Sequence, residues 1–201
     1  MFDSYDRSGP QVFVGEYAAT ANAGGLPTGL LGNSIGEAAF MTGMERNSDI
    51  VHMTSYAPLF ANYNHTQWNP DLIGYDQTSS FGSTSYWVQQ MFARNVGDTV
   101  LPVTANASGL YYSATIDSRS GQVYLKIVNP GSQDVPSQLS FGGRNASAAS
   151  IEVLADPDPQ AGNTLASPDA VVPARGTLHG SAGVFSYLVP ANSLTVVRVA
   201  R

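Results

Sequence analysis

Glutamate is the residue type in this sequence best placed for carboxylate chemistry, and it occurs four times. Glu16 follows the short apolar run 11–14, which predicts a strand buried on both faces. Barrel enzymes carry catalytic groups at the carboxyl ends of such strands. Glu37 and Glu45 fall on a predicted helix, where capping or solvent exposure is the ordinary role, and Glu152 falls mid-strand, where an outward orientation is expected. Glu16 is therefore the candidate catalytic residue, although one carboxylate after an apolar run is also compatible with an ordinary surface position.

His52 and Ser34 offer two other chemistries, and the surroundings of neither residue support them. On an alternating strand His52 points with Ile50 and Thr54, which indicates a packing role rather than a metal ligand or a base. Ser34 lies in Gly-Asn-Ser-Ile-Gly, but this segment opens a helix after a loop, whereas a nucleophile elbow joins a strand to a helix. We therefore expect no serine hydrolase triad. Three scattered histidines without any cysteine also predict no metal site.

A long segment, residues 56–82, is rich in asparagine, proline and aromatic residues. It contains Trp68 and Asn69, whose side-chain types stack on sugar rings and hydrogen-bond to hydroxyl groups. Loops longer than about 12 to 15 residues are usually functional or disordered, and the aromatic content here predicts an ordered surface. The same side chains would serve equally well to pack two parts of the molecule against each other.

The first half of the chain has the pattern of alternating strands and helices. Ser34 and Glu37 have the spacing of a capping box at a helix start, and Gly97 is a favourable left-handed helix terminator. The predicted elements are strand 11–14, helix 34–46, strand 49–55 and a second helix, which is capped by Ser83 or Thr84 and ends at Gly97. This order predicts two βα units of a parallel barrel.

Beyond residue 97 the period of the apolar residues falls to two. Short strands separated by turn signals over about 100 residues are typical of a β-sandwich. The predicted strands cover residues 99–105, 110–116, 122–128, 137–141, 150–154, 183–189 and 193–199. Residues 156–173, with four prolines, are expected to form an excursion between two strands. The fold class is therefore mixed, with residues 1–97 as part of a barrel and residues 98–201 as an antiparallel, jelly-roll-like sandwich.

The composition excludes several classes of partner. Nine Lys and Arg against 15 Asp and Glu give a net charge of −6, so the positive field that nucleic acid binding requires is missing. No apolar stretch approaches the ~20 residues that span a bilayer, and we expect neither membrane association nor a signal peptide in this sequence. The 201 residues also fall short of a complete (β/α)8 barrel, which takes roughly 250.

Several motifs, in order along nearly the whole chain, resemble the C-terminal region of glycoside hydrolase family 51, the α-L-arabinofuranosidases. The matching segments are residues 13–18 (Phe-Val-Gly-Glu-Tyr-Ala), 37–49, 55–60 (Ser-Tyr-Ala-Pro-Leu-Phe), 68–71 (Trp-Asn-Pro-Asp), 82–87, 163–165, 171–173 and 193–196. Members of this family carry a (β/α)8 barrel followed by a jelly-roll-like sandwich, which agrees with the two halves predicted above.

The resemblance implies roles for individual residues. In this family the glutamate of the Gly-Glu-Tyr-Ala type is the nucleophile, which assigns that role to Glu16. The resemblance also implies a sugar-contacting role for Gln77, and Trp68, Asn69 and Tyr17 are further candidate substrate-binding residues. No cofactor is implied. The implied substrate is an oligo- or polysaccharide of hemicellulose or pectin that carries terminal, non-reducing α-L-arabinofuranosyl groups.

One departure from the family is as informative as the match. Retaining glycosidases need two carboxyl groups roughly 5 to 5.5 Å apart, and the family takes its acid/base from a Gly-Asn-Glu motif on an earlier barrel strand. Here Gly32 and Asn33 are followed by Ser34, and the first six barrel strands have no counterpart. We therefore expect a fragment that is inactive alone and needs the missing strands in cis or in trans.

Other properties stay open at this point. A homo-oligomer is compatible with the sequence, and the full-length parent is compatible with an extracellular location. The alternative function is a free-standing β-sandwich module that binds carbohydrate or serves a structural role, with the βα part as its packing partner.

Overall fold

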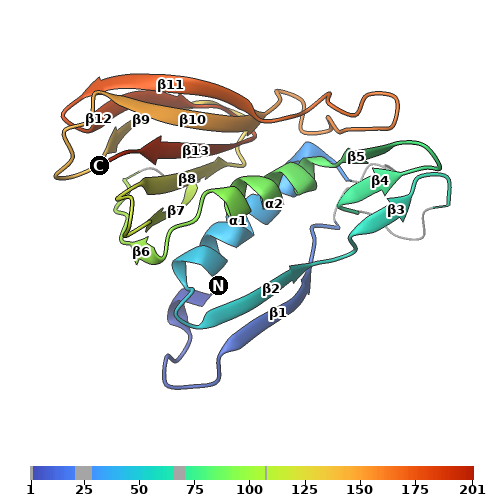
Figure 1. Ribbon diagram of the computed structural model, residues 1–201, viewed down its shortest axis with the longest axis horizontal. Coiled ribbons are helices and arrows are strands. Elements are labelled where there is room, and N and C mark those ends of the chain that lie inside the picture. Colours follow the sequence, from blue (N-terminus) through green and yellow to red (C-terminus); the bar gives the residue numbers. More distant parts are fainter. Residues whose placement is uncertain (1, 21–28, 66–70, 107) are drawn as a thin grey trace.

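The computed structural model describes residues 2–20, 29–65, 71–106 and 108–201. Two helices lie between a small parallel sheet and a large curved sheet (Figure 1). A short 3-10 helix, Phe2–Ser4, precedes β1 (Val12–Tyr17), α1 (Leu31–Arg46) and β2 (Val51–Tyr56). β1 and β2 pair in parallel, so the predicted strand–helix–strand order is confirmed. The prediction that the first strand is buried on both faces is wrong, because alternate residues of β1 are exposed.

The start of α1 differs from the predicted capping box. The helix begins at Leu31, three residues before Ser34, and no side chain of the described residues caps it. Two of its free backbone N–H groups instead donate to carbonyl oxygens of the 156–173 excursion, Leu31 to Ala161 and Gly32 to Pro159, both at 2.9 Å. Helix ends must satisfy such groups in some way, and here a segment distant in sequence accepts the bonds.

The second helix follows the sequence prediction at its start and departs from it at its end. α2 (Thr84–Arg94) begins at Ser83, whose hydroxyl accepts a hydrogen bond from the Tyr86 N–H at 3.1 Å. It ends at Asn95, and Gly97 does not terminate it with a left-handed turn. Glycine is needed at position 97 for another reason: a Cβ there would collide with the backbone of Ile116.

The segment between β2 and α2 contains short strands instead of one long loop. β3 (Phe60–Asn62) pairs in parallel with β4 (Ile73–Tyr75), which pairs antiparallel with β5 (Ser80–Gly82). This small sheet lies beyond the carboxyl end of β2 (Figure 1).

The second half is one antiparallel sheet of eight strands, curled so that its two ends face each other across a buried apolar cluster. The sheet order is β6-β7-β8-β13-β10-β11-β12-β9. The strands are β6 (Thr99–Leu101), β7 (Tyr111–Ile116), β8 (Val123–Asn129), β9 (Val135–Ser140), β10 (Ala148–Ala155), β11 (Ala174–Ser181), β12 (Val184–Val189) and β13 (Ser193–Val199). All seven predicted strands are present, and β11 was missed because its sequence lacks apolar alternation.

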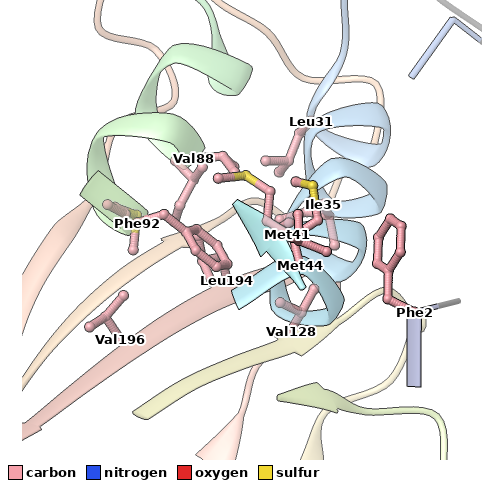
Figure 2. Packing of buried hydrophobic residues seen from close by; sticks show 14 of the residues in the cluster. Phe2, Leu31, Ile35, Met41, Met44, Val88, Phe92, Val128, Leu194 and Val196 are labelled. Carbon is pink, nitrogen blue, oxygen red and sulfur yellow. The ribbon is translucent and has the colours of Figure 1, made fainter. Parts of the chain in front are cut away.

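Both helices pack on the outer face of this sheet (Figures 1 and 2). Figure 2 shows Ile35 and Met44 of α1 and Val88 of α2 around Val128 and Leu194 of the sheet. On their other side the helices contact apolar residues of β1 and β2, so one cluster joins all three layers.

A buried ion pair fixes α1 on the sheet. Glu45 binds the ammonium group of Lys126 on β8, and Lys126 is fully buried. The Lys126 Nζ also lies 5.2 Å from the centre of the Phe92 ring on α2. Burial lowers the pKa of Lys126, and the Glu45 charge opposes that shift. Glu45 is therefore an interior residue, and the prediction that it serves as a cap or faces solvent is wrong.

Glu152 is the second glutamate held in an interior ion pair. It faces away from the interior of the curled sheet, as expected, but it is buried, with a relative exposure of 8%. Its carboxylate binds Arg198 on β13, and Arg198 also donates to Asn95 at the end of α2. The helices therefore cover polar as well as apolar positions of the sheet.

No helix among the described residues is long and apolar enough to cross a membrane. Within the same residues, no three His, Cys, Asp or Glu side chains gather as metal ligands would.

Removing Glu45 should destabilise the chain strongly. We expect Glu45→Ala to lower the free energy of unfolding by about 3 to 5 kcal/mol, because it leaves a buried ammonium group without its counter-charge. Urea denaturation of the purified chain measures this. The matched control is Asp49→Ala, which removes the exposed pair with Arg7 and should cost at most about 1 kcal/mol. Equal losses in the two variants would contradict the assigned role of the buried pair.

Candidate active site

Glu16 owes its orientation to an irregularity in β1. Val14 pairs with Thr54 and Tyr17 with Tyr56, so three steps on β1 match two on β2. The extra residue is a β-bulge, which is rare in parallel pairs and common next to active sites. Val14 faces the helices, so in a regular strand Gly15 would face away from them and Glu16 would face them again. Instead, Gly15 and Glu16 are both exposed. The bulge thus leaves Glu16 on the face of β1 away from the helices.

A second irregularity on β2 compensates for the first. Val12 pairs with Val51 but Phe13 pairs with Met53, so His52 is the extra residue here. The prediction that His52 packs beside Ile50 is wrong. His52 is exposed, whereas Ile50, which precedes the first residue of β2, is buried. The two bulges together restore the original register at the carboxyl ends of both strands.

The face that carries Glu16 is apolar and uncovered by the described residues. Phe13 and Met53 pair across the two strands and are 60% and 62% exposed. Exposed groups of large apolar side chains are typical of surfaces that contact a partner, a ligand or another segment. Glu16 lies at the carboxyl end of this patch, which is where a parallel barrel carries its reacting groups.

Tyr17 points to the opposite side. Its hydroxyl donates to Gln89 Oε1 of α2 at 2.8 Å, and its ring lies 5.7 Å from the rings of both Phe40 and Tyr56. Burial raises the pKa of Tyr17 to about 12. The structure therefore places this side chain between the strands and the helices, where it supports the strand end beneath Glu16.

The other residues expected to bind substrate belong to the segment after β2. Gln77 is exposed in the turn between β4 and β5, and Asp76 holds that turn by accepting hydrogen bonds from the backbone N–H groups of Thr78 and Ser79, both at 2.8 Å. Trp68 and Asn69 lie outside the described residues. The small sheet carries exposed aromatic side chains, Phe60 and Tyr75, with ring centres 6.5 Å apart.

Two buried carboxyl groups near the end of β2 were not predicted. Glu37 was expected at a helix cap but is buried at 3% exposure, with Oε1 accepting from the Ala19 N–H at 2.9 Å and from the Tyr56 hydroxyl at 3.3 Å. Burial raises the pKa of Glu37, and these hydrogen bonds, with one from Ser85, oppose the shift.

Ser34 is also buried, and its hydroxyl bonds to Thr84 and Ser85, which excludes it as an exposed nucleophile.

Asp71 is the second buried carboxyl group. It is 2% exposed, and its Oδ2 has no hydrogen-bond partner among the described residues. Burial raises its pKa to about 6. Burial raises the pKa of Tyr56. The negative charges of Glu37 and, to a smaller extent, of Asp71 raise it further. Asp71 and Glu37 thus both act on the hydroxyl of Tyr56, the last residue of β2.

Comparison with known proteins agrees with this geometry. The family described as "Alpha-L-arabinofuranosidase C-terminal domain" matches residues 15–193, so the chain belongs to that family. It is 42% identical over 98% of its length to α-L-arabinofuranosidase A of Aspergillus kawachii, and 37% identical over 97% to α-L-arabinofuranosidase 1 of Arabidopsis thaliana. The chain spans about 30% of the length of each of these relatives.

Solved structures show the same fold. The arabinose-bound MgGH51 α-L-arabinofuranosidase superposes with a TM-score of 0.91 at 38% identity, covering 99% of this chain and 34% of that one. The Thermotoga maritima α-L-arabinofuranosidase superposes with a TM-score of 0.79 at 17% identity, covering 95% of this chain and 43% of that one, which shows the fold alone. The curled eight-stranded sheet is thus that of the C-terminal region of family 51 glycoside hydrolases.

The raised pKa of Asp71 makes stability depend on pH. Between about pH 4 and pH 6 the unfolded chain releases the Asp71 proton while the folded chain retains it, so stability falls as pH rises. Asp71→Asn should remove this penalty and stabilise the chain by about 2 to 3 kcal/mol more at pH 7.5 than at pH 4. Urea denaturation at both pH values measures the difference.

Asp76→Asn is the control for this prediction. Hydrogen bonds from Thr78 and Ser79 lower the pKa of Asp76, so the stability it contributes is present above its ordinary pKa and lost on acidification. The Asp76 variant should therefore show the opposite trend with pH. A pH-independent effect of Asp71→Asn would contradict the assignment.

Proposed function

We propose that this chain is the C-terminal part of a retaining α-L-arabinofuranosidase that removes terminal, non-reducing α-L-arabinofuranosyl groups from hemicellulose or pectin side chains. Glu16 is the nucleophile. The observation that carries the proposal is the bulge in β1, which exposes this carboxylate at the carboxyl end of a parallel strand, on the face away from the helices. The names of the relatives at 37–42% identity support the substrate class.

The proposal treats β1, α1, β2 and α2 as the last two βα units of a (β/α)8 barrel. Its support is the parallel pairing of β1 with β2 and the apolar face formed by Phe13 and Met53. In a closed barrel this face would line the interior, where large side chains fill the space. Residues 1–97 would then complete the catalytic barrel and residues 98–201 would form the sandwich domain, with the helices shared between them.

In the proposed reaction the Glu16 carboxylate attacks the anomeric carbon while a carboxylic acid protonates the departing oxygen. Water then cleaves the glycosyl ester, and the second group acts as base. The second group must come from the missing part of the barrel, in cis or in trans. Glu37 does not serve, because it is buried on the helix side of the strands. Gln77 is proposed to contact the sugar from the β4–β5 turn.

The alternative of a free-standing carbohydrate-binding module is less well supported. A binding module has no use for an exposed carboxylate at the end of a barrel-type strand, and the relatives of this chain are named as glycosidases over a much longer sequence.

The isolated chain should not hydrolyse p-nitrophenyl α-L-arabinofuranoside at a detectable rate. It lacks the second carboxyl group, and general acid–base assistance alone is commonly worth about 10² to 10⁴ in rate. A spectrophotometric assay of the purified chain tests this. Turnover that disappears in Glu16→Gln would contradict the prediction and make Asp76 the first candidate for the second carboxyl group.

The role of Glu16 can be tested in a hybrid in which this chain replaces the matching C-terminal part of the Aspergillus kawachii enzyme. Glu16→Ala should lower kcat by several orders of magnitude, and azide should restore part of it by attacking the anomeric carbon from the vacated volume. The product would be an arabinosyl azide. His52→Ala, at an exposed position on the neighbouring strand, should leave kcat unchanged. Retained activity in Glu16→Ala would refute the nucleophile assignment.

A further inference from the structure

Glu37 connects the carboxyl ends of both parallel strands. One oxygen, Oε1, accepts from the N–H of Ala19, three residues after Glu16, and from the hydroxyl of Tyr56, the last residue of β2. The two distances are 2.9 and 3.3 Å. Glu37 thereby ties the segment that leaves β1 to the end of β2.

The strand end that carries Glu16 depends on such side-chain contacts because its ladder is interrupted. A bulge leaves one residue without regular pairing, and here it lies between Val14 and Tyr17. Beyond it, the Ala57 N–H donates to the Tyr17 carbonyl at 3.3 Å, and the Tyr17 hydroxyl donates to Gln89. Just after Glu16, Ala19 is held by Glu37 through its N–H and by Asn33 Nδ2, which donates to its carbonyl at 3.0 Å.

A carboxyl group is a costly choice for this interior position. It is 97% shielded from solvent, and its Oε2 has no hydrogen-bond partner among the described residues. Burying a carboxyl group that is incompletely satisfied destabilises the fold. An apolar side chain of similar volume would pack between α1 and the strands at lower cost, so stability alone does not account for Glu37.

We infer that Glu37 is a positioning residue that sets the orientation of Glu16 through its hydrogen bonds to Ala19 and Tyr56. This inference rests on the proposed function of Glu16. It assigns Glu37 no contact with substrate, since the two carboxyl groups lie on opposite sides of β1. The part of Glu37 that matters is its acceptor oxygen, so glutamine should replace it and leucine should not.

The test uses the hybrid enzyme described above and compares Glu37→Leu with Glu37→Gln. Misplacing a reacting group by about 1 Å can cost 10²-fold in rate. We expect Glu37→Leu to lower kcat by about 10- to 100-fold with KM within about 2-fold, and Glu37→Gln to restore kcat to within about 3-fold of the parent. A leucine variant that unfolds at the same temperature as the parent but keeps full kcat would overturn the inference.

Glu45→Gln is the matched control, because Glu45 is a second interior glutamate of the same helix whose carboxylate binds the sheet. It should lower the unfolding temperature without changing kcat per folded molecule. Tyr56→Phe removes the Tyr56 hydrogen bond to Glu37 and leaves the bond from Ala19 in place, so this variant is used if the leucine variant does not fold. It should lower kcat by a smaller factor than leucine, and an unchanged kcat would overturn the inference.

The outcomes separate the inference from the proposed function. If Glu16→Ala retains activity, the nucleophile assignment fails. If Glu16→Ala is inactive and rescued by azide while Glu37→Leu and Tyr56→Phe keep full kcat, the positioning role alone fails. An equal loss in Glu37→Gln and Glu37→Leu would also overturn it, since the acceptor oxygen would then not be what matters.

Discussion

The outer face of the curled sheet is apolar and must be shielded from water. The two helices shield it, and this packing determines where β1 and β2 can lie. Val128, Leu154, Leu194 and Val196 all lie on this face and are fully buried beneath the helices. Burying a side chain of this size stabilises a protein by about 1.5 to 3 kcal/mol. Separating the helices from the sheet would therefore cost several kcal/mol. Because one side of the helices is occupied by the sheet, β1 and β2 pack on the opposite side.

This arrangement determines which face of the strands is available for chemistry. Val12, Val14 and Tyr17 of β1 pack against the helix layer, so an exposed functional group must lie on the other face. The bulge before Tyr17 satisfies both demands: Tyr17 remains against Tyr56 and Phe40, while Glu16 is turned outward. In a strand without the extra residue, either Tyr17 would lose its packing against the helices or Glu16 would face them.

The sequence predicts features whose causes are local. The start of α2 at Ser83 was predicted because the capping bond spans three residues, and most strands of the curled sheet were predicted because apolar alternation is visible within each. The start of α1 was not predicted, because its N–H groups bond to carbonyls of residues 159 and 161. Strand β11 was missed because its pairing partners, and not its own side chains, keep it in the sheet.

In the candidate site, too, the features with local causes could be predicted and those that depend on distant partners could not. Glu16 could be chosen as the candidate nucleophile from its position after an apolar run and from the family resemblance, whereas the interior contacts of Glu37, Glu45 and Glu152 could not be predicted. Each of these three carboxylates was expected at a cap, in solvent or on an open face, whereas Glu37 and Glu152 are buried and the Glu45 side chain is only 12% exposed. Their partners include Ala19, Lys126 and Arg198, and no spacing along the chain marks such distant pairs.

The contact between residues 156–173 and the start of α1 has a consequence for how this region can evolve. Leu31 and Gly32 recognise the main-chain carbonyls of Ala161 and Pro159 rather than their side chains. Substitutions at Pro159, which is exposed, should therefore meet little selection, because almost any residue presents the same carbonyl, whereas the side chain of Ala161 packs against the core. An insertion or deletion would shift the carbonyls away from the helix end, so the length of the segment should stay constant while its exposed positions change. Its buried residues, Asn163 and Val171, should resist substitution.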